Sequence, residues 1–179
     1  MGIPFRIAPS DVNEGLRPGE DAPTAARRIA RRKAEAQPPG DDPVLAADTL
    51  VFLGDRIFGK PADDEDARRM LRALSGRAHS VVTAVVLRAD GRILERSDVS
   101  RVRFASLTDD EIAAYVASGE PADKAGAYAL QGGGARFIEG IEGSPSNVIG
   151  LPARAVYDLL REAGLEGMAL PSAGRTPTA

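Results

Sequence analysis

The most constraining feature of the sequence is a carboxylate inside an apolar segment. Residues 44–53 read VLAADTLVFL: the apolar run at 44–47 is typical of a strand buried on both faces and ends in Asp48, and a second apolar run follows at 50–53. A charged carboxylate in such surroundings is costly unless a cation or a hydrogen-bond donor pairs with it. Gly54-Asp55 is typical of a two-residue hairpin turn, and the returning stretch ends in Gly59-Lys60-Pro61. The pattern leaves two interpretations open: a buried ion pair that fixes a hairpin, and a catalytic site.

The sequence does not fix which side chains of this hairpin share a face. A two-residue turn at 54–55 would place Lys60 opposite Thr49 and diagonally beside Asp48. Strict alternation would then put Lys60 and Asp48 on opposite faces of the sheet. The glycine and the proline that flank Lys60 disfavour regular pairing, so the question stays open at this point.

Charge and composition exclude several classes of protein. The chain has 179 residues, a formal net charge of −3 and no cysteine, which excludes disulfides and thiolate metal sites. The acidic balance argues against a general nucleic-acid coat, and no apolar stretch is long enough for a transmembrane helix. We therefore expect a globular protein without a stable nucleic-acid or membrane partner. Because the N-terminus lacks a signal-peptide pattern, we expect a cytoplasmic location.

Local signals predict helices and strands in alternation. Asp21, with a proline two residues later, is typical of a helix start, and Thr108 with Glu111 is typical of a capping box. The predicted helices cover residues 21–37, 63–75, 108–119 and 152–163. The predicted strands cover residues 1–8, 44–53, 56–58, 79–87, 92–95, 98–104 and 136–141. We predict a turn at 143–147 and disorder at 165–179.

A few charged side chains are candidates for an anion site. Only three of the 23 basic residues are lysines, at positions 33, 60 and 124. Lys33 shares a helix face with Ile29, so its ammonium group either extends past the apolar surface to water or reaches an anion. Glu14 lies in a polar, turn-rich stretch, where it either points into a cleft or is a solvated loop acid.

Eight short motifs occur in order along the chain. They are SDVNE at 10–14, AADT at 46–49, GKP at 59–61, LSG at 74–76, YVASGEP at 115–121, DKAGAY at 123–128, LQG at 130–132 and GSPSNVIGLP at 143–152. Together they resemble the Maf family of nucleoside triphosphate pyrophosphatases. The resemblance covers nearly all of residues 3–163.

This resemblance implies a fold. It implies an α/β protein of the two-lobed Maf/ITPase-like kind, with a mixed, twisted sheet and flanking helices around a central cleft. Residues 1–164 would form a single domain, and residues 165–179 a disordered tail. The family resemblance also implies a possible homodimer.

The resemblance further implies a reaction. Family members hydrolyse a nucleoside triphosphate between the α and β phosphates, and they need a divalent cation such as Mg²⁺ or Mn²⁺. Asp48 matches the proposed general base of the family. The positions that line the phosphate end of the cleft correspond to Glu14, Lys33 and Lys60. The positions associated with specificity correspond to Thr49 and Gln131, and their identity is that of the branch acting on dTTP and UTP.

Residue chemistry agrees with these implied roles. A magnesium-type ion prefers oxygen ligands, which Asp48 and Glu14 are able to supply. Lysines are point charges suited to phosphate groups. Gln131 presents a donor and an acceptor together, which suits the paired carbonyl and N–H groups of thymine or uracil.

One departure from the family keeps a second function open. The family begins with a strand, a Ser-x-Ser-x-Arg-Arg loop and a helix, which would precede Gly2 and do not occur in this sequence. We expect the natural protein to be longer, because every later site position is intact. The alternative function is a non-catalytic nucleotide-binding regulator linked to cell division or septum formation.

Overall fold

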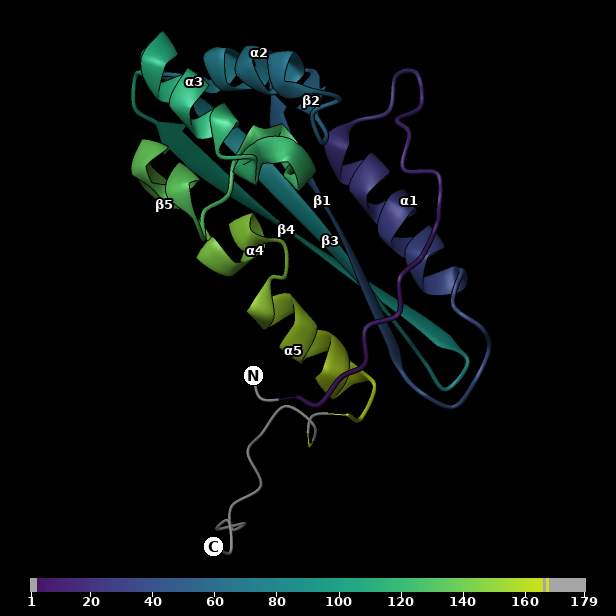
Figure 1. Cartoon of the computed structure of the whole chain (residues 1–179). Helices are drawn as coiled ribbons and strands as arrows, with labels where there is room; N and C mark the ends of the chain where they lie inside the picture. The colour runs from purple at the N-terminus through teal and green to yellow at the C-terminus, as the bar shows by residue number, and fades with distance from the viewer. Residues whose placement is uncertain (1–2, 166, 168–179) are drawn as a thin grey trace, which may run out of the picture.

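The sheet has five strands in the order β2-β1-β3-β4-β5. The computed structural model describes residues 3–165 and 167 (Figure 1). The strands are β1 (Val44–Leu53), β2 (Arg56–Phe58), β3 (Ala78–Ala89), β4 (Arg92–Phe104) and β5 (Ile138–Glu142). The α/β class with flanking helices is confirmed. The implied mixed sheet is corrected, since all four pairings of the described strands are antiparallel. The hairpins β1–β2 and β3–β4 require this, because so short a turn joins only antiparallel neighbours.

Strand β1 runs without a break through the apolar segment. It pairs with β3 from Val44 to Phe52, so Asp48 lies in the middle of a strand. The outer neighbour, β2, pairs only with residues 51–53 of β1. Among the described strands, none pairs with the outer edge of residues 44–50, and this unpaired edge is where the candidate site lies.

The helices begin and end close to the predicted positions. They are α1 (Ala22–Glu35), α2 (Asp64–Leu74), α3 (Asp109–Ala117), α4 (Pro145–Ile149) and α5 (Ala153–Glu162). Short 3-10 segments follow α3: η1 (Glu120–Asp123), η2 (Ala125–Ala127) and η3 (Gly133–Phe137). The carboxylate of Asp21 accepts a hydrogen bond from the Thr24 N–H, and Thr108 forms the predicted capping box with Glu111. No helix of residues 3–165 and 167 combines the length and apolar character needed to cross a bilayer.

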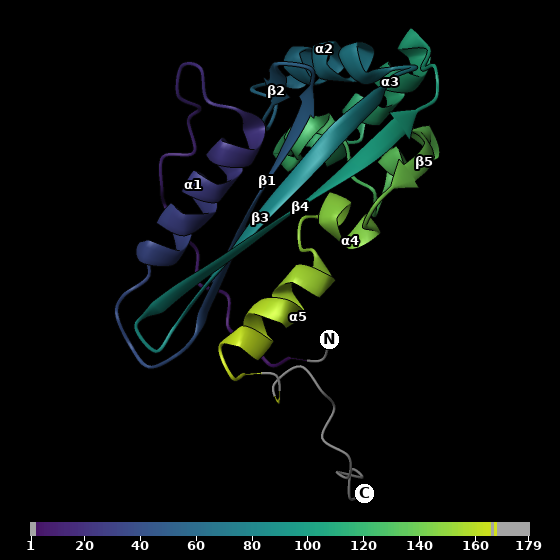
Figure 2. The same ribbon diagram turned by 180° about the vertical axis from the view of Figure 1, so that it is seen from behind.

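Helices cover both faces of the sheet. On one face, the buried alanines of α1 pack against Leu50 of β1 and against Val82, Ala84 and Val86 of β3. On the other face, Val156, Leu159 and Leu160 of α5 pack against Val85 and Leu87 of β3. Helices α2 and α3 form a third apolar cluster with one end of the sheet. The two views show α2 and α3 at the end of the long strands that lies away from the β3–β4 turn (Figures 1 and 2).

Four local predictions are wrong in detail. Residues 3–8 form no strand, because Pro4 lacks an N–H group and Phe5 and Ile7 are exposed to solvent. Residues 92–104 form one strand where two were predicted. Residues 145–149 form helix α4 where a turn was predicted, and β5 begins only at Ile138, after a 3-10 segment.

The predicted tail lies almost entirely outside the described residues. Of residues 165–179, only Leu165 and Gly167 are described. Leu165 donates its backbone N–H to the carbonyl of Leu160 at 2.7 Å and packs against the α5 cluster. The prediction of disorder for the remainder stays a prediction.

We predict that the close packing of α1 on the sheet tolerates no larger side chain. Ala30 is 0% exposed, so Ala30→Leu should destabilise the protein by about 1–3 kcal/mol through overpacking. Urea unfolding measures the change. Arg27→Leu introduces the same side chain on the exposed face of α1 and should change the free energy of unfolding by less than about 0.5 kcal/mol. Equal effects of the two substitutions would contradict this account of the helix packing.

Candidate active site

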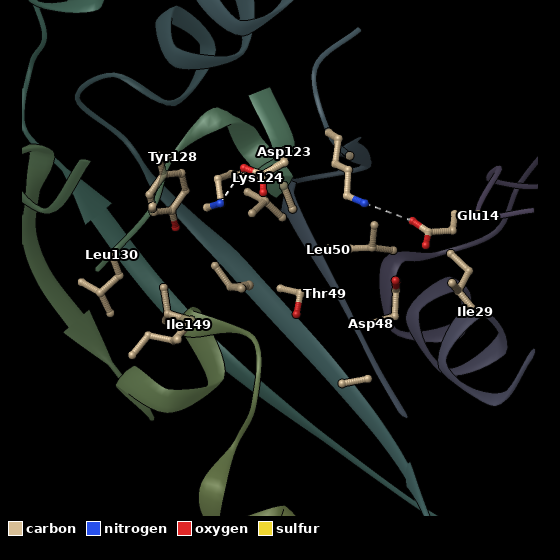
Figure 3. Close-up of a pocket in the computed structure, with 18 of the residues that line it drawn as sticks. Glu14, Ile29, Asp48, Thr49, Leu50, Asp123, Lys124, Tyr128, Leu130 and Ile149 are labelled. Atoms are coloured by element: carbon tan, nitrogen blue, oxygen red, sulfur yellow. Dashed lines mark hydrogen bonds and ion pairs between the residues drawn. The ribbon is translucent and has the colours of Figure 1, made fainter. Parts of the chain in front are cut away.

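A cleft of about 640 Å³ crosses the unpaired edge of β1. Such a volume is in the range of small-molecule sites. Successive residues of a strand point to opposite faces, so Asp48 faces α1 whereas Thr49 faces away from it. Both residues line the same cleft, because the cleft passes over the edge between the two faces (Figure 3). All three lysines of the sequence, Lys33, Lys60 and Lys124, also line it.

Four of the predicted site residues form one charged cluster. Lys33 Nζ lies 2.7 Å from Asp48 Oδ1 and 2.8 Å from Glu14 Oε1. Lys60 Nζ lies 3.7 Å from Glu14 Oε2, a contact drawn as a dashed line in Figure 3. Asp48 is therefore part of a buried ion pair, but its cation is Lys33 of α1, so the pair does not join the two strands of the hairpin as one interpretation had it. The open question of the faces is also answered, because Lys60, which follows the end of β2, reaches the same cluster as Asp48.

Helix α1 places these charges. Its buried alanines bring the helix close to the sheet, and Lys33 lies one turn after the fully packed Ile29. The helix also holds the segment that carries Glu14. Arg32 donates to the carbonyl of Asn13 at 3.2 Å, and Arg28 donates to the carbonyl of Gly15 at 3.0 Å. The backbone on both sides of Glu14 is thus held, and the residue lines the cleft while remaining exposed to solvent.

Burial makes Asp48 a stronger base than an ordinary aspartate. Its side chain is 7% exposed, and this burial raises its pKa above the usual 3.8, although the hydrogen bond from Lys33 acts in the opposite direction. Burial alone would lower the pKa of Lys33, but its hydrogen bonds to Asp48 and Glu14 raise it overall. Burial alone would raise the pKa of Glu14, but the Lys33 contacts lower it. Asp48 Oδ2 is buried and has no hydrogen-bond partner within the described residues.

The two predicted specificity residues lie in the same cleft. Thr49 is half-buried, and its hydroxyl group lies 2.9 Å from that of Thr83 on the neighbouring strand. Gln131 is exposed in the turn between η2 and η3. Figure 3 draws Thr49 between Asp48 and the apolar side chains of Leu130 and Ile149. The cleft therefore has a charged part beside α1 and a less polar part beside α4.

Comparison with known proteins identifies the family. The family model described as "Maf-like protein" matches residues 1–163. This chain belongs to the Maf family.

Relatives of this Maf chain carry a common name. It is 48% identical over 175 residues to the dTTP/UTP pyrophosphatase of Chromobacterium violaceum, covering 93% of this chain and 87% of the relative. It is 51% identical over 168 residues to the protein of that name in Anaeromyxobacter dehalogenans, with coverages of 92% and 86%. For the protein of that name in Aquifex aeolicus the identity is 45% over 167 residues, with coverages of 92% and 87%.

Sequence reasoning missed the side chains that hold the Gln131 loop of this Maf chain. Glu120 accepts hydrogen bonds from the Tyr115 hydroxyl at 2.6 Å and from the Gly133 N–H at 2.9 Å. These contacts, led by the Tyr115 hydroxyl, lower the pKa of Glu120. A methyl group at Gly132 would overlap the Glu120 carboxylate, which explains a glycine at that position. The three consecutive glycines were the available signal, but they did not reveal which side chain approaches them.

The donor set fits a divalent cation that is completed by its substrate. Within the described residues there is no group of three or more histidine, aspartate or glutamate side chains able to hold a metal. Asp48 Oδ2 is a buried oxygen without a partner, and Glu14 lies across Lys33 from it. Mg²⁺ commonly binds through one or two carboxylates, water and substrate phosphates, so two carboxylates are compatible with such an ion.

We predict that removing the Lys33 ammonium makes stability depend on pH through Asp48. In Lys33→Met the buried carboxylate has no counter-ion, so its folded-state pKa rises further above the unfolded value. The folded state then binds a proton more tightly than the unfolded state. Relative to wild type, stability should be retained below about pH 4 and lost as the pH rises through the new pKa, by roughly 2–3 kcal/mol because Lys33 is only partly buried.

The double variant Lys33→Met with Asp48→Asn isolates this effect. Asparagine does not titrate, so the double variant should lose the extra pH dependence. Urea unfolding between pH 4 and pH 8 measures both variants. A pH dependence that persists in the double variant would show that another group causes it.

Proposed function

We propose that this chain is a nucleoside triphosphate pyrophosphatase that hydrolyses dTTP and UTP to the monophosphate and diphosphate. The observation that carries the proposal is the Asp48 carboxylate, buried with one oxygen free, in a cleft lined by all three lysines of the chain. The names of the relatives support the reaction and the pyrimidine substrates. No observation on the described residues favours the alternative of a non-catalytic regulator of cell division.

Asp48 has the properties of a general base for the attack of water. Lys33 donates to Oδ1, and Oδ2 has no partner among the described residues, so the carboxylate has acceptor capacity left for a proton of the attacking water. In the proposed step, Asp48 takes a proton from water, the water oxygen bonds to phosphorus, and the bridging P–O bond breaks to release diphosphate. The raised pKa of Asp48 increases the basicity of its carboxylate.

The charge balance of the cleft calls for a divalent cation. The three lysines are matched by three carboxylates that also line the cleft, those of Glu14, Asp48 and Asp123. The side chains of the described lining residues therefore supply no excess positive charge for a triphosphate. Asp48 and Glu14 would hold Mg²⁺ or Mn²⁺, which when bound neutralises charge on the phosphates. The lysines would orient the phosphate groups by direct contact.

In this proposal, different parts of the substrate lie on the two faces of β1. We assign the phosphates to the α1 side, where Lys33 and Lys60 lie with Glu14. The nucleobase of the substrate then lies on the other side of β1, near Thr49 and Gln131. A cytoplasmic location is part of the proposal, because nucleoside triphosphates are the substrates. A homodimer and the lack of a stable nucleic-acid partner also stay proposals, which rest on the family resemblance and on the net charge of −3.

We predict that Asp48→Asn lowers kcat with dTTP or UTP by about 10²–10⁴-fold, because the amide cannot accept the proton. A diphosphate-specific assay with Mg²⁺ or Mn²⁺ measures the loss, and nucleotide binding should persist. Asp55→Asn, in the turn between β1 and β2, is the matched control and should leave kcat unchanged. Unchanged turnover in Asp48→Asn would remove Asp48 from the base role, and release of orthophosphate alone would contradict the reaction.

We predict an acidic limb in the pH profile of kcat/KM that reports Asp48. Activity requires the ionised carboxylate, so it should fall as the pH decreases through the Asp48 pKa, which burial raises above 3.8. In Lys33→Met the midpoint of this limb should move to higher pH, because the stabilising ammonium is gone. Steady-state kinetics from pH 4 to pH 8 give both midpoints. If the midpoint is the same in wild type and in Lys33→Met, the acidic limb reports the titration of a group other than Asp48.

A further inference from the structure

The Thr49 hydroxyl belongs to a chain of hydrogen bonds that continues below the cleft. Thr49 and Thr83 are directly paired across β1 and β3, with their hydroxyl oxygens 2.9 Å apart. The Thr83 hydroxyl donates to the backbone carbonyl of Asn147 in α4 at 2.8 Å. Thr83 and Asn147 are both 0% exposed and do not line the cleft. The ligand therefore meets only the first member of the chain.

This arrangement fixes the direction of the Thr49 proton. A hydroxyl group has one proton and two lone pairs, and a carbonyl oxygen is only an acceptor. Because Thr83 uses its proton on the Asn147 carbonyl, it acts as the acceptor toward Thr49. Thr49 must then donate its own proton to Thr83. The Thr49 oxygen therefore presents only its two lone pairs to the cleft.

The carbonyl at the end of the chain is held in place. The Asn147 carboxamide accepts a hydrogen bond from the Thr83 N–H at 3.0 Å and donates to the carbonyl of Val81 at 2.9 Å. It also donates to the Ser100 hydroxyl at 2.9 Å, so three contacts fix α4 on the sheet. A Cβ atom on Gly150, just after α4, would lie 3.3 Å from the Thr49 oxygen, so α4 also closes one side of that hydroxyl.

We propose that Thr83 is a positioning residue that makes Thr49 an acceptor-only contact, selective for the ring N–H of uracil or thymine. Cytosine carries an unprotonated nitrogen at the same ring position, and two facing acceptors repel. This inference rests on the proposed function, because the proposed function places the nucleobase on the Thr49 side of the cleft. It adds to that function the hydrogen-bonding group of the nucleobase, a ring N–H donor, that the site selects.

Gln131 does not supply this selectivity by itself. It is exposed, and its side chain makes no hydrogen bond to another described residue. Its carboxamide is therefore free to turn and to present either its donor or its acceptor. Thr49 donates its only hydroxyl proton to Thr83, so it is able to act only as an acceptor toward a ligand.

The test compares uracil and cytosine nucleotides in Thr83 variants. Thr83→Val keeps the shape of the side chain but removes the acceptor for the Thr49 proton, so Thr49 becomes able to donate to cytosine. The ratio of kcat/KM for UTP over CTP should fall about tenfold, the contribution of one ordinary hydrogen bond. Thr83→Ser keeps the hydroxyl group and should keep the wild-type ratio. An unchanged ratio in Thr83→Val, or an equal fall in Thr83→Ser, would overturn the inference.

A second variant covers the case in which Thr83→Val does not fold. Thr49→Val removes the acceptor itself, so it should lower kcat/KM for UTP and bring the UTP and CTP values together. A Thr49→Val enzyme with the wild-type ratio would overturn the inference. Where both variants fold, the double variant should show the ratio of Thr49→Val alone, because Thr83 acts only through Thr49.

Binding measurements separate this inference from the proposed function. Calorimetry with UMP and CMP needs no hydrolysis. A preference for UMP that is lost in Thr83→Val and kept in Thr83→Ser would support the inference even if no triphosphate were hydrolysed. Hydrolysis of UTP with no effect of Thr83→Val on either ratio would support the proposed function and overturn the inference.

Discussion

The contact on which the rest of the site depends is the ion pair between Lys33 and Asp48. Asp48 lies in the middle of a strand and faces a helix whose contact surface is mostly alanine. Small side chains let α1 approach the sheet closely, and only a long side chain at the end of that surface is able to reach the carboxylate. The same ammonium holds Glu14 at 2.8 Å. One cation therefore offsets the burial of Asp48 and holds the carboxylate of Glu14.

A second constraint is the shortness of β2. Neighbouring residues of a strand point to opposite faces, so Asp48 and Thr49 would serve separate surfaces in the interior of a sheet. Because β2 pairs only with residues 51–53, no described strand pairs with the outer edge of β1 beside these two residues. The cleft passes over this edge and is lined by both side chains.

The sequence predicts well what depends on local chemistry. The cost of burying Asp48 predicts its ion pair, and the cap residues predict the helix starts near Asp21 and Thr108. What it does not predict depends on distant parts of the chain. The Asn147 contact to Thr83 spans 64 residues, and although Asn147 lies in the motif at 143–152, nothing in the sequence pairs it with Thr83. The three glycines at 132–134 are compatible with a close approach of the backbone or with a sharp turn, and only the fold shows that Glu120 is their partner.

The two halves of the cleft follow the same physical rule. On the α1 side, Lys33 occupies one oxygen of Asp48 and leaves the other without a partner. On the α4 side, Thr83 accepts the proton of Thr49 and leaves its lone pairs toward the cleft. In each case a residue that lines the cleft has one hydrogen-bonding role left, because a neighbouring side chain has taken the other. An unpartnered polar group is costly to bury, and a ligand that supplies the missing partner removes that cost. Selectivity then arises from packing beneath the site as much as from the side chains that line it.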